Sequence, residues 1–485
     1  MESAYKKIIK DTSYLLSSSL LSRFFSGIAG IITARVLGPE DFGLLKIINY
    51  VPSLAKFGSF GFSDVAKREI PHIRGSVQNR EKEKEIRNVS FSSEILWLLL
   101  LSIIIVVISF FYDSKIKYGL WIVSISLFLS GISKVYGICL SVEKRFSILA
   151  SAGVLKSMLV SAIILSTVYW GEVYSVLFAG LIGGLFTLLY FKQKINLDFS
   201  FSISKTEFIR QLKIALPFAG ITASYGIYGW TQRIQITILF GIEFLGYYML
   251  VVFFIQSISL LINTFLKASS IELYERLSSS SGSNNTKSLI LKPSMILAVI
   301  LPYIACLAWL GGGSIIDFLL QDYSPSKIML PFLIPILLFE GISAMPRTAM
   351  RSAKLNMQNG VLLLRLISTF FFAVITYIVG YKYDYGLIGI IAARTLATFI
   401  LFLGSYIMIV KYLFSSTLNM FKTILEMLLP AFIMLIISYL NIKLIGIESL
   451  VNTLLCIFLM SLFSSPIFFI YMRKFKLVYL FKGLF

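Results

Sequence analysis

About fourteen apolar stretches, each long enough to cross a lipid bilayer, occupy about two-thirds of this 485-residue chain. A spanning helix needs about 20 apolar residues, so the connections between the stretches are short. Charged residues make up 14% of the chain, whereas a soluble domain carries about 25%. We therefore predict an all-α polytopic membrane protein with about 14 transmembrane helices.

The first stretch is rich in serine and begins near Asp11. It lacks a small-residue cleavage site and its apolar pattern continues through Leu37, so we predict a spanning helix and not a cleavable signal peptide. The predicted spans are approximately 11–36, 43–66, 89–111, 118–142, 148–169, 174–192, 214–240, 246–271, 289–312, 328–349, 359–381, 386–411, 421–441 and 448–471.

Basic residues are distributed unevenly between the two sets of loops. If the N-terminus is cytoplasmic, segments on that side carry about thirty of the 44 Lys and Arg residues. The opposite loops carry five: Lys115, Lys117, Lys327, Lys382 and Lys443. This asymmetry and the even number of spans predict a multi-pass protein of the cytoplasmic (inner) membrane with both termini in the cytoplasm. It also accounts for most of the net charge of +20, so nucleic acid is not an expected partner.

An internal repeat divides the chain. The turn Leu37–Gly43 joins the first two spans, and Phe240–Gly246 joins the seventh and eighth, an offset of 203 residues. Gly, Glu and Gly occupy matching positions in the two turns. Six spans per repeat preserve orientation, so the repeat predicts two pseudo-symmetric six-helix bundles and two extra helices. We assign an N-terminal lobe to 1–192, a cytoplasmic linker to 193–213, a C-terminal lobe to 214–411, and two additional helices with a basic cytoplasmic tail to 412–485.

Among the basic residues within the predicted spans we single out nine, because a cation there must face protein or a wet cavity. Glu340 is the one acid near the middle of a span, whereas Asp64, Glu94 and Glu426 lie towards span ends. Because the positive charge exceeds the negative charge there, we expect an anionic molecule from outside the protein to balance it. The nine residues are Arg23, Arg35, Lys46, Lys56, Lys134, Lys156, Arg233, Arg365 and Arg394.

We rank these residues by their depth in the spans. The deepest are predicted to bind substrate: Arg23, Lys56, Lys156, Arg233 and Arg394. Arg35, Lys46, Lys134 and Arg365 are further candidates for the substrate path, with snorkelling to an interface as the alternative for those near span ends. Three aromatic residues in the seventh span are candidates for stacking on sugars or simply for packing: Tyr225, Tyr228 and Trp230.

Glu340 and Asp64 are candidates for ion coupling. Structural pairing is the alternative for each: Glu340 with an arginine, Asp64 with Lys67 or Arg68. Cys139, Cys306 and Cys456 lie in apolar spans without metal-ligand spacing and are expected to pack. No phosphate-binding Gly-rich loop ending in Lys and Ser or Thr occurs. We therefore predict no catalytic residues, no metal site and no cofactor.

The turn Ala34–Gly43, Gly58–Phe62 and Ala66–Glu69 resemble the Wzx-like polysaccharide transport branch of the multidrug/oligosaccharidyl-lipid/polysaccharide exporter superfamily. The length and the two six-span halves agree with that family over the whole chain. The resemblance implies a MATE/flippase-like fold and a transporter that moves polyprenyl-diphosphate-linked oligosaccharide by alternating access around a cationic cavity. It implies this lipid, membrane lipids, and a polysaccharide polymerase with other assembly proteins as partners.

Three other functions compete with this interpretation. A lipid II flippase also moves a lipid diphosphate, so charge does not separate it from the first hypothesis. A drug/cation antiporter of the same superfamily requires an anionic cavity, the opposite sign. A membrane glycosyltransferase or polymerase requires carboxylates in an aqueous loop, for which Asp317 and Asp322 are the outer pair.

Overall fold

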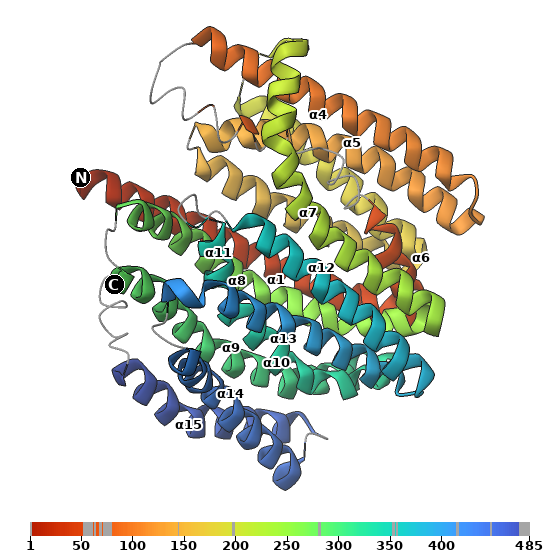
Figure 1. Cartoon of the computed structure of the whole chain (residues 1–485). Helices are drawn as coiled ribbons and strands as arrows, with labels where there is room; N and C mark the ends of the chain where they lie inside the picture. Colours follow the sequence, from red (N-terminus) through yellow and green to blue (C-terminus); the bar gives the residue numbers. More distant parts are fainter. Residues whose placement is uncertain are drawn as a thin grey trace. The chain divides into compact units, whose positions relative to one another are not determined.

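The computed structural model describes residues 2–51, 62, 65–66, 70, 80–143, 145–195, 199–279, 283–351, 355, 357–413, 417–446 and 449–474. Every regular element in these ranges is helical (Figure 1). Eleven of the described helices are long and apolar enough to cross a membrane. The prediction of an all-helical membrane protein is therefore confirmed. The chain divides into two compact units, Met1–Trp230 and Thr231–Phe485.

The described part of the first unit contains five helices, of which the last continues beyond it. Within this unit α1 packs along α6, and α5 packs against both α4 and α6. The close pairing of α4 with α5 is visible in Figure 1. The helices are α1 (Glu2–Ile48), α4 (Arg80–Ser109), α5 (Ser114–Val142), α6 (Phe146–Lys194) and α7 (Lys205–Phe240).

Helix α6 explains part of the difference between fourteen predicted spans and eleven observed helices. Its 49 residues would extend about 74 Å as one straight helix, more than twice the thickness of the bilayer core. At Glu172 the backbone leaves the helical region (φ 44°, ψ −129°), between the predicted spans 148–169 and 174–192. A methyl group added at Gly183 would lie only 2.4 Å from Val160 Cγ2. The two halves of α6 therefore fold back on each other as two crossings.

The repeated turns adopt a shared backbone feature. Helix α1 is broken at Gly38 (φ 69°), and the chain between α7 and α8 turns at Gly241 (φ 96°). Both angles lie in the region that favours glycine. The positions that follow are also equivalent, because Phe42 and Leu245 are both at most 1% exposed. The sequence repeat is thus a repeat of conformation and burial.

The second unit contains the last residues of α7 and the remaining helices. Helix α9 lies at its centre and packs against α8, α10, α13, α14 and α15, while α12 pairs with α13. Its helices are α8 (Ile242–Ser279), α9 (Ser283–Leu319), the 3₁₀ helix η1 (Gln321–Phe332), α10 (Leu333–Ile342), α11 (Ala344–Met350), α12 (Gln358–Ile375), the π-helix η2 (Thr376–Lys382), α13 (Gly386–Leu413), α14 (Thr417–Ile445) and α15 (Leu450–Lys474).

The exposed face of helix α14, which points away from the rest of this unit, is apolar. Leu425 and Phe432 are more than 60% exposed, whereas Met427 and Met434 on the inner face are 1% exposed. A soluble protein would place charged residues on the exposed face, but lipid tails accept leucine and phenylalanine. The exposed face of α14 therefore contacts lipid.

Polar side chains fix the segment that leads into α7 onto the start of α4, within the first unit. Asn88 Nδ2 donates to Ser200 Oγ at 2.7 Å, and the Ser202 amide donates to Ser92 Oγ at 3.0 Å. The ring of Phe199 packs against Phe91, with centroids 6.2 Å apart. Residues 199–202 are therefore anchored to α4 by both hydrogen bonds and packing.

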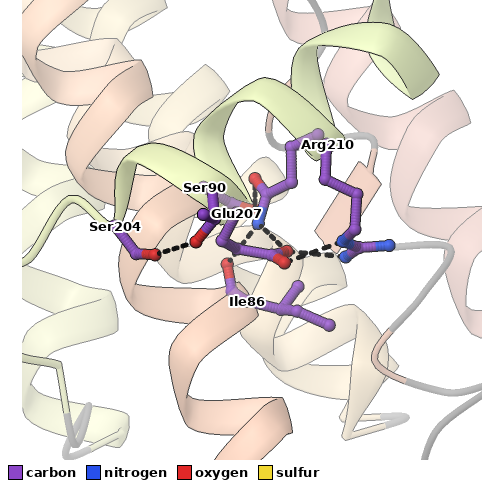
Figure 2. Close-up of polar contacts among 7 residues, drawn as sticks. Ile86, Ser90, Ser204, Glu207 and Arg210 are labelled. Carbon is purple, nitrogen blue, oxygen red and sulfur yellow. Dashed lines mark hydrogen bonds and ion pairs between the residues drawn. The ribbon is translucent and has the colours of Figure 1, made fainter.

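The first turns of α7 extend this anchor. Gln211 accepts a hydrogen bond from Ser90 Oγ at 2.8 Å and donates to the Ile86 carbonyl at 3.2 Å and to Glu207 Oε1 at 2.8 Å. Figure 2 shows Glu207 facing Arg210, whose Nε donates to Glu207 Oε2 at 2.7 Å. Burial alone would raise the pKa of the Glu207 carboxyl, but these donors and the neighbouring positive charge bring the pKa below its ordinary value. The carboxylate is therefore the charged centre of the anchor.

Candidate functional site

Three arginines are buried in the second unit, each on a different helix. Arg233 on α7 and Arg365 on α12 are 7% exposed, and Arg394 on α13 is 6% exposed. Within the described part of this unit, every charged residue that is buried to this degree is an arginine. Burying a cation is unfavourable unless a negative charge or a polar environment stabilises it. The fully buried charge in the described part of this unit is therefore positive.

Tyr248 on α8 contacts one of these arginines. Arg394 Nη1 donates to the Tyr248 hydroxyl at 2.8 Å, and the guanidinium carbon lies 5.8 Å from the centroid of the ring. The charges of Arg394, Arg233 and Glu340 all act on the Tyr248 hydroxyl. Arg394 and Tyr248 are in contact; we call these two residues, together with Arg233 and Glu340, whose charges act on the same hydroxyl, the arginine cluster.

The pairing of α12 with α13 gives the depth of the cluster. Ser368 Oγ donates to the Ala397 carbonyl at 2.9 Å, and the η2–α13 contact brings Gly380 against Gly389. Because these antiparallel contacts bracket Arg394, it lies at about the level of residues 371–375. Gln235 Nε2 donates to the Ala373 carbonyl at 2.6 Å, which places the adjoining turn of α7, with Arg233, at a similar depth. Arg365 lies about 12 Å before Ala373 along α12.

Glu340 on α10 supplies one negative charge to the cluster. Its side chain is half-buried and accepts a hydrogen bond from Ser259 Oγ at 3.3 Å. Its backbone carbonyl accepts from Arg347 Nη2 at 3.1 Å. Pairing with an arginine and ion coupling both stay predictions for Glu340.

In the first unit the predicted cations are less buried. Arg23 and Arg35 on α1 are exposed. Lys156 on α6 is half-buried, and its aliphatic carbons lie against Gly183 of the same hairpin. Arg23 and Lys156 stay predicted substrate ligands, and Arg35 stays a path candidate.

Two further path candidates have partners within the first unit. Lys46 Nζ lies 4.3 Å from the centroid of the Phe42 ring. Lys134 Nζ on α5 contacts Glu94 Oε1 on α4 at 2.9 Å, and the Glu94 side chain is 1% exposed. This ion pair gives Lys134 a structural role, because a buried carboxylate needs a positive partner. The sequence alone did not indicate that pairing.

The aromatic candidates on α7 differ in burial. Trp230 is half-buried and meets Tyr50 edge to face at 5.6 Å. The Tyr50 hydroxyl donates to the Gly226 carbonyl at 3.2 Å, and a methyl group at Gly229 would collide with it. The glycines of α7 thus make room for Tyr50. The remaining two candidates are the exposed Tyr225 and the buried Tyr228.

Lys56 and Asp64 lie outside the described residues. Sequence reasoning missed Tyr248, which belongs to the cluster, and Ser259, which donates a hydrogen bond to Glu340. Tyr248 lies two residues after the repeated turn Phe240–Gly246. Its position beside that turn was the signal in the sequence that could have marked it as a candidate. The predicted packing role of the cysteines is confirmed, since Cys139, Cys306 and Cys456 are free and buried.

The fold is similar to that of solved transporters. The lipid II flippase MurJ, in an inward closed conformation, is 17% identical with a TM-score of 0.70, over 95% of this chain and 99% of that one. An inward-facing multidrug resistance MATE transporter of the MOP superfamily is 16% identical with a TM-score of 0.66, over 83% and 98%. A MOP superfamily transporter from Pyrococcus furiosus Vc1, described by the reverse polarity of its binding pocket, is 17% identical with a TM-score of 0.57, over 83% and 96%.

These similarities give the fold of a membrane transporter and not that of a glycosyltransferase or polymerase. No curated protein is similar enough to count as a match. The sequence profile described as "Polysaccharide biosynthesis protein" matches residues 8–271, more than half of the chain. The chain therefore belongs to this polysaccharide biosynthesis family, whose Wzx-like flippase branch the sequence resembles.

Proposed function

We propose that the protein is a flippase that moves polyprenyl-diphosphate-linked oligosaccharide, the repeat unit of a surface polysaccharide, across the cytoplasmic membrane. The observation that carries this proposal is the sign of the buried charge in the second unit, where Arg233, Arg365 and Arg394 are all positive. A lipid diphosphate carries at least two negative charges, which hydrocarbon excludes.

Arginine suits this substrate chemically. Its planar guanidinium offers several donors that match phosphate oxygens, and it stays charged when buried. Tyr248 orients Arg394 through a hydrogen bond and the face of its ring. In this proposal Arg233 and Arg394 bind the diphosphate, while Arg23, Lys56 and Lys156 are the ligands from the first unit.

A lipid II flippase is the second candidate. The similarity to MurJ extends over 95% of this chain, and lipid II has the same charged group as the first substrate. A drug/cation antiporter receives less support, because a cationic drug would be repelled by the arginine cluster. The Pyrococcus furiosus transporter, which is described by the reverse polarity of its binding pocket, is an example of this fold with a pocket of altered polarity.

Transport in this proposal proceeds by alternating access. Both termini are cytoplasmic, the substrate moves from the inner to the outer leaflet, and a polymerase with other assembly proteins receives it there. The excess of basic residues in the predicted cytoplasmic loops supports this orientation.

The test is transport by the purified full-length protein in lipid vesicles. Three fluorescent substrates are compared: a polyprenyl-diphosphate oligosaccharide, lipid II, and a cationic dye. We expect transport of the first and none of the dye. Transport of lipid II alone would favour the second candidate, and transport of the dye alone would contradict the proposal.

A further inference from the structure

The first turns of α7 are held to the first unit through a polar face. Glu207 and Gln211 are buried there, at 7% and 0% exposed. Gln211 accepts a hydrogen bond from Ser90 and donates to the Ile86 carbonyl, both on α4, and Figure 2 shows Glu207 on the same side of the helix. The side of α7 that faces protein is therefore polar.

The opposite face of the same turns is exposed and partly apolar. Four exposed residues spaced three or four apart lie on this side of the helix: Lys205, Ile209, Lys213 and Leu216. Ile209 is 42% exposed and Leu216 is 56% exposed. A helix surrounded by water would expose its polar side and bury its aliphatic residues. This arrangement is the reverse, so the exposed face of α7 is suited to an apolar surrounding.

The segment just before α7 adds two more exposed apolar side chains. Phe201 is 59% exposed and Ile203 is 45% exposed. The backbone between them is fixed to α4, because the Ser202 amide donates to Ser92 Oγ at 3.0 Å. These side chains are therefore presented from an anchored segment. We call Phe201, Ile203 and the four exposed residues of α7 the α7 surface.

The α7 surface lies at the edge of the membrane and is basic. The predicted span begins at 214, so the turns from Lys205 to Lys213 adjoin the hydrocarbon. The one acid between 199 and 216 is Glu207, which is buried beside Arg210, so Lys205 and Lys213 supply the exposed charge. Lys205 is also the first residue of α7, where the helix dipole disfavours a cation. An anion close to Lys205 would offset this effect.

A phospholipid with an anionic headgroup meets both requirements. Acyl chains accept aliphatic and aromatic side chains, and the long stem of lysine lets its amino group reach the level of the phosphates. Lysines at a membrane surface favour anionic lipids over neutral ones. A soluble anion would leave the apolar half of the surface in water.

We propose that the α7 surface lies in the headgroup layer and binds anionic phospholipid. Lys205 and Lys213 contact the phosphate, and Ile209 and Leu216 contact the acyl chains. In the proposed orientation this is the cytoplasmic leaflet. The inference does not depend on the arginine cluster, and it gives the start of α7 a ligand other than the transported substrate.

The test measures binding of anionic phosphatidylglycerol and of neutral phosphatidylcholine to the full-length protein in detergent. Lys205→Gln/Lys213→Gln should weaken binding of phosphatidylglycerol by about 30-fold, since each lysine at a lipid surface contributes a factor of about 5. Binding of phosphatidylcholine should stay within about 2-fold, because a neutral headgroup gains little from lysine. Lys84→Gln is the matched control, because Lys84 is an exposed lysine on α4 that lies between Glu83 and Glu85.

A second variant, Ile209→Ser/Leu216→Ser, tests the apolar half of the surface. It should weaken binding of phosphatidylglycerol by about 10-fold, because two aliphatic side chains no longer contact the acyl chains. Both double variants should melt at the wild-type temperature, since the replaced side chains are exposed. Loss of binding in the lysine variant alone would indicate a site for a soluble anion and overturn the lipid assignment.

Three other results would overturn the proposal. Wild-type affinity of Lys205→Gln/Lys213→Gln for phosphatidylglycerol would remove the headgroup site, and an equal loss in Lys84→Gln would indicate an effect of net charge alone. An equal loss of affinity for polyprenyl-diphosphate oligosaccharide would assign the surface to the substrate. Arg394→Ala separates the two proposals, because it should weaken binding of that oligosaccharide lipid and leave binding of phosphatidylglycerol unchanged.

Discussion

Replacing Tyr248 with Phe should impair transport through its effect on Arg394. The substitution removes the hydroxyl that accepts a hydrogen bond from Arg394 Nη1 at 2.8 Å and keeps the ring 5.8 Å from the guanidinium carbon. Because Tyr248 has no exposed surface, water does not replace the lost acceptor. Arg394 should therefore lose its fixed orientation while its charge and the packing around it remain.

The magnitude follows from the type of bond. A hydrogen bond to a charged group contributes about 1.5–3 kcal/mol, and about 1.4 kcal/mol corresponds to a tenfold change in an equilibrium constant. If the orientation of Arg394 serves the substrate, affinity should fall by about 10- to 150-fold. Phe keeps the cation–π contact, worth about 0.5–1 kcal/mol, so the loss should be smaller than for Arg394→Ala.

The assay is binding and transport of the lipid-linked oligosaccharide in vesicles at matched protein content. Tyr406→Phe is the matched control, because Tyr406 is equally buried in the same unit and its hydroxyl donates to the Ile342 carbonyl. Tyr248→Phe should add no further loss to Arg394→Ala, since the hydroxyl acts through that arginine. Wild-type affinity in Tyr248→Phe, together with an inactive Arg394→Ala, would refute the reasoning.

Three further predictions address coupling, the anchor of α7 and topology. Glu340→Gln should keep substrate binding but abolish the response of transport to an imposed pH gradient, because glutamine at position 340 cannot take up or release a proton. An unchanged response in vesicles would make Glu340 a structural partner. Glu207→Gln should lower thermal stability at neutral pH, since the carboxylate that accepts from Arg210 is lost. The pKa of Glu207 is lowered by folding, so its contribution to stability is present above the ordinary glutamate pKa and disappears as the pH falls through the lowered value. The melting temperatures of the variant and the wild type should therefore converge as the pH falls below the ordinary glutamate pKa, and a constant difference would contradict this account. A cysteine placed at Gln78, after removal of the native cysteines, should resist impermeant reagents added to intact cells, and labelling from outside would reverse the proposed orientation.

The helices and the repeat follow from local sequence. Apolar length predicts a spanning helix because a bilayer admits few alternatives. The repeated glycines predict a special turn because few residues adopt positive φ, and Gly38 and Gly241 have that conformation. The number of separate helices was harder to predict, because α6 continues through the break at Glu172 as one element of the chain.

The partners of the charged residues did not follow from sequence. Arg233 and Arg394 were identified by depth alone, and both are buried. Lys134 and Glu94 are forty residues apart and meet only because α4 packs against α5. Tyr248 reads as one aromatic residue among many until Arg394 on α13 is placed beside it. Hydropathy predicts which segments lie in the membrane, but it does not predict which faces of the helices contact each other.

Two glutamines on α7 illustrate the same limit. Gln232 and Gln235 are visible in the sequence as a polar patch beside Arg233. Whether an amide has a partner depends on the neighbouring helices, and only the structure separates the bonded Nε2 of Gln235 from its Oε1. The hydrogen-bonding role of each amide therefore depends on its three-dimensional contacts.

The most direct test of the central claim is the affinity of Arg233→Ala/Arg394→Ala for a polyprenyl-diphosphate oligosaccharide, measured beside wild type in vesicles of the same composition. If the buried arginines hold the diphosphate, the double variant should insert and fold normally yet lose binding and transport together. A double lysine variant should recover only part of both, because lysine keeps the charge without the paired donors of arginine. Wild-type binding and transport by the double alanine variant would contradict the account.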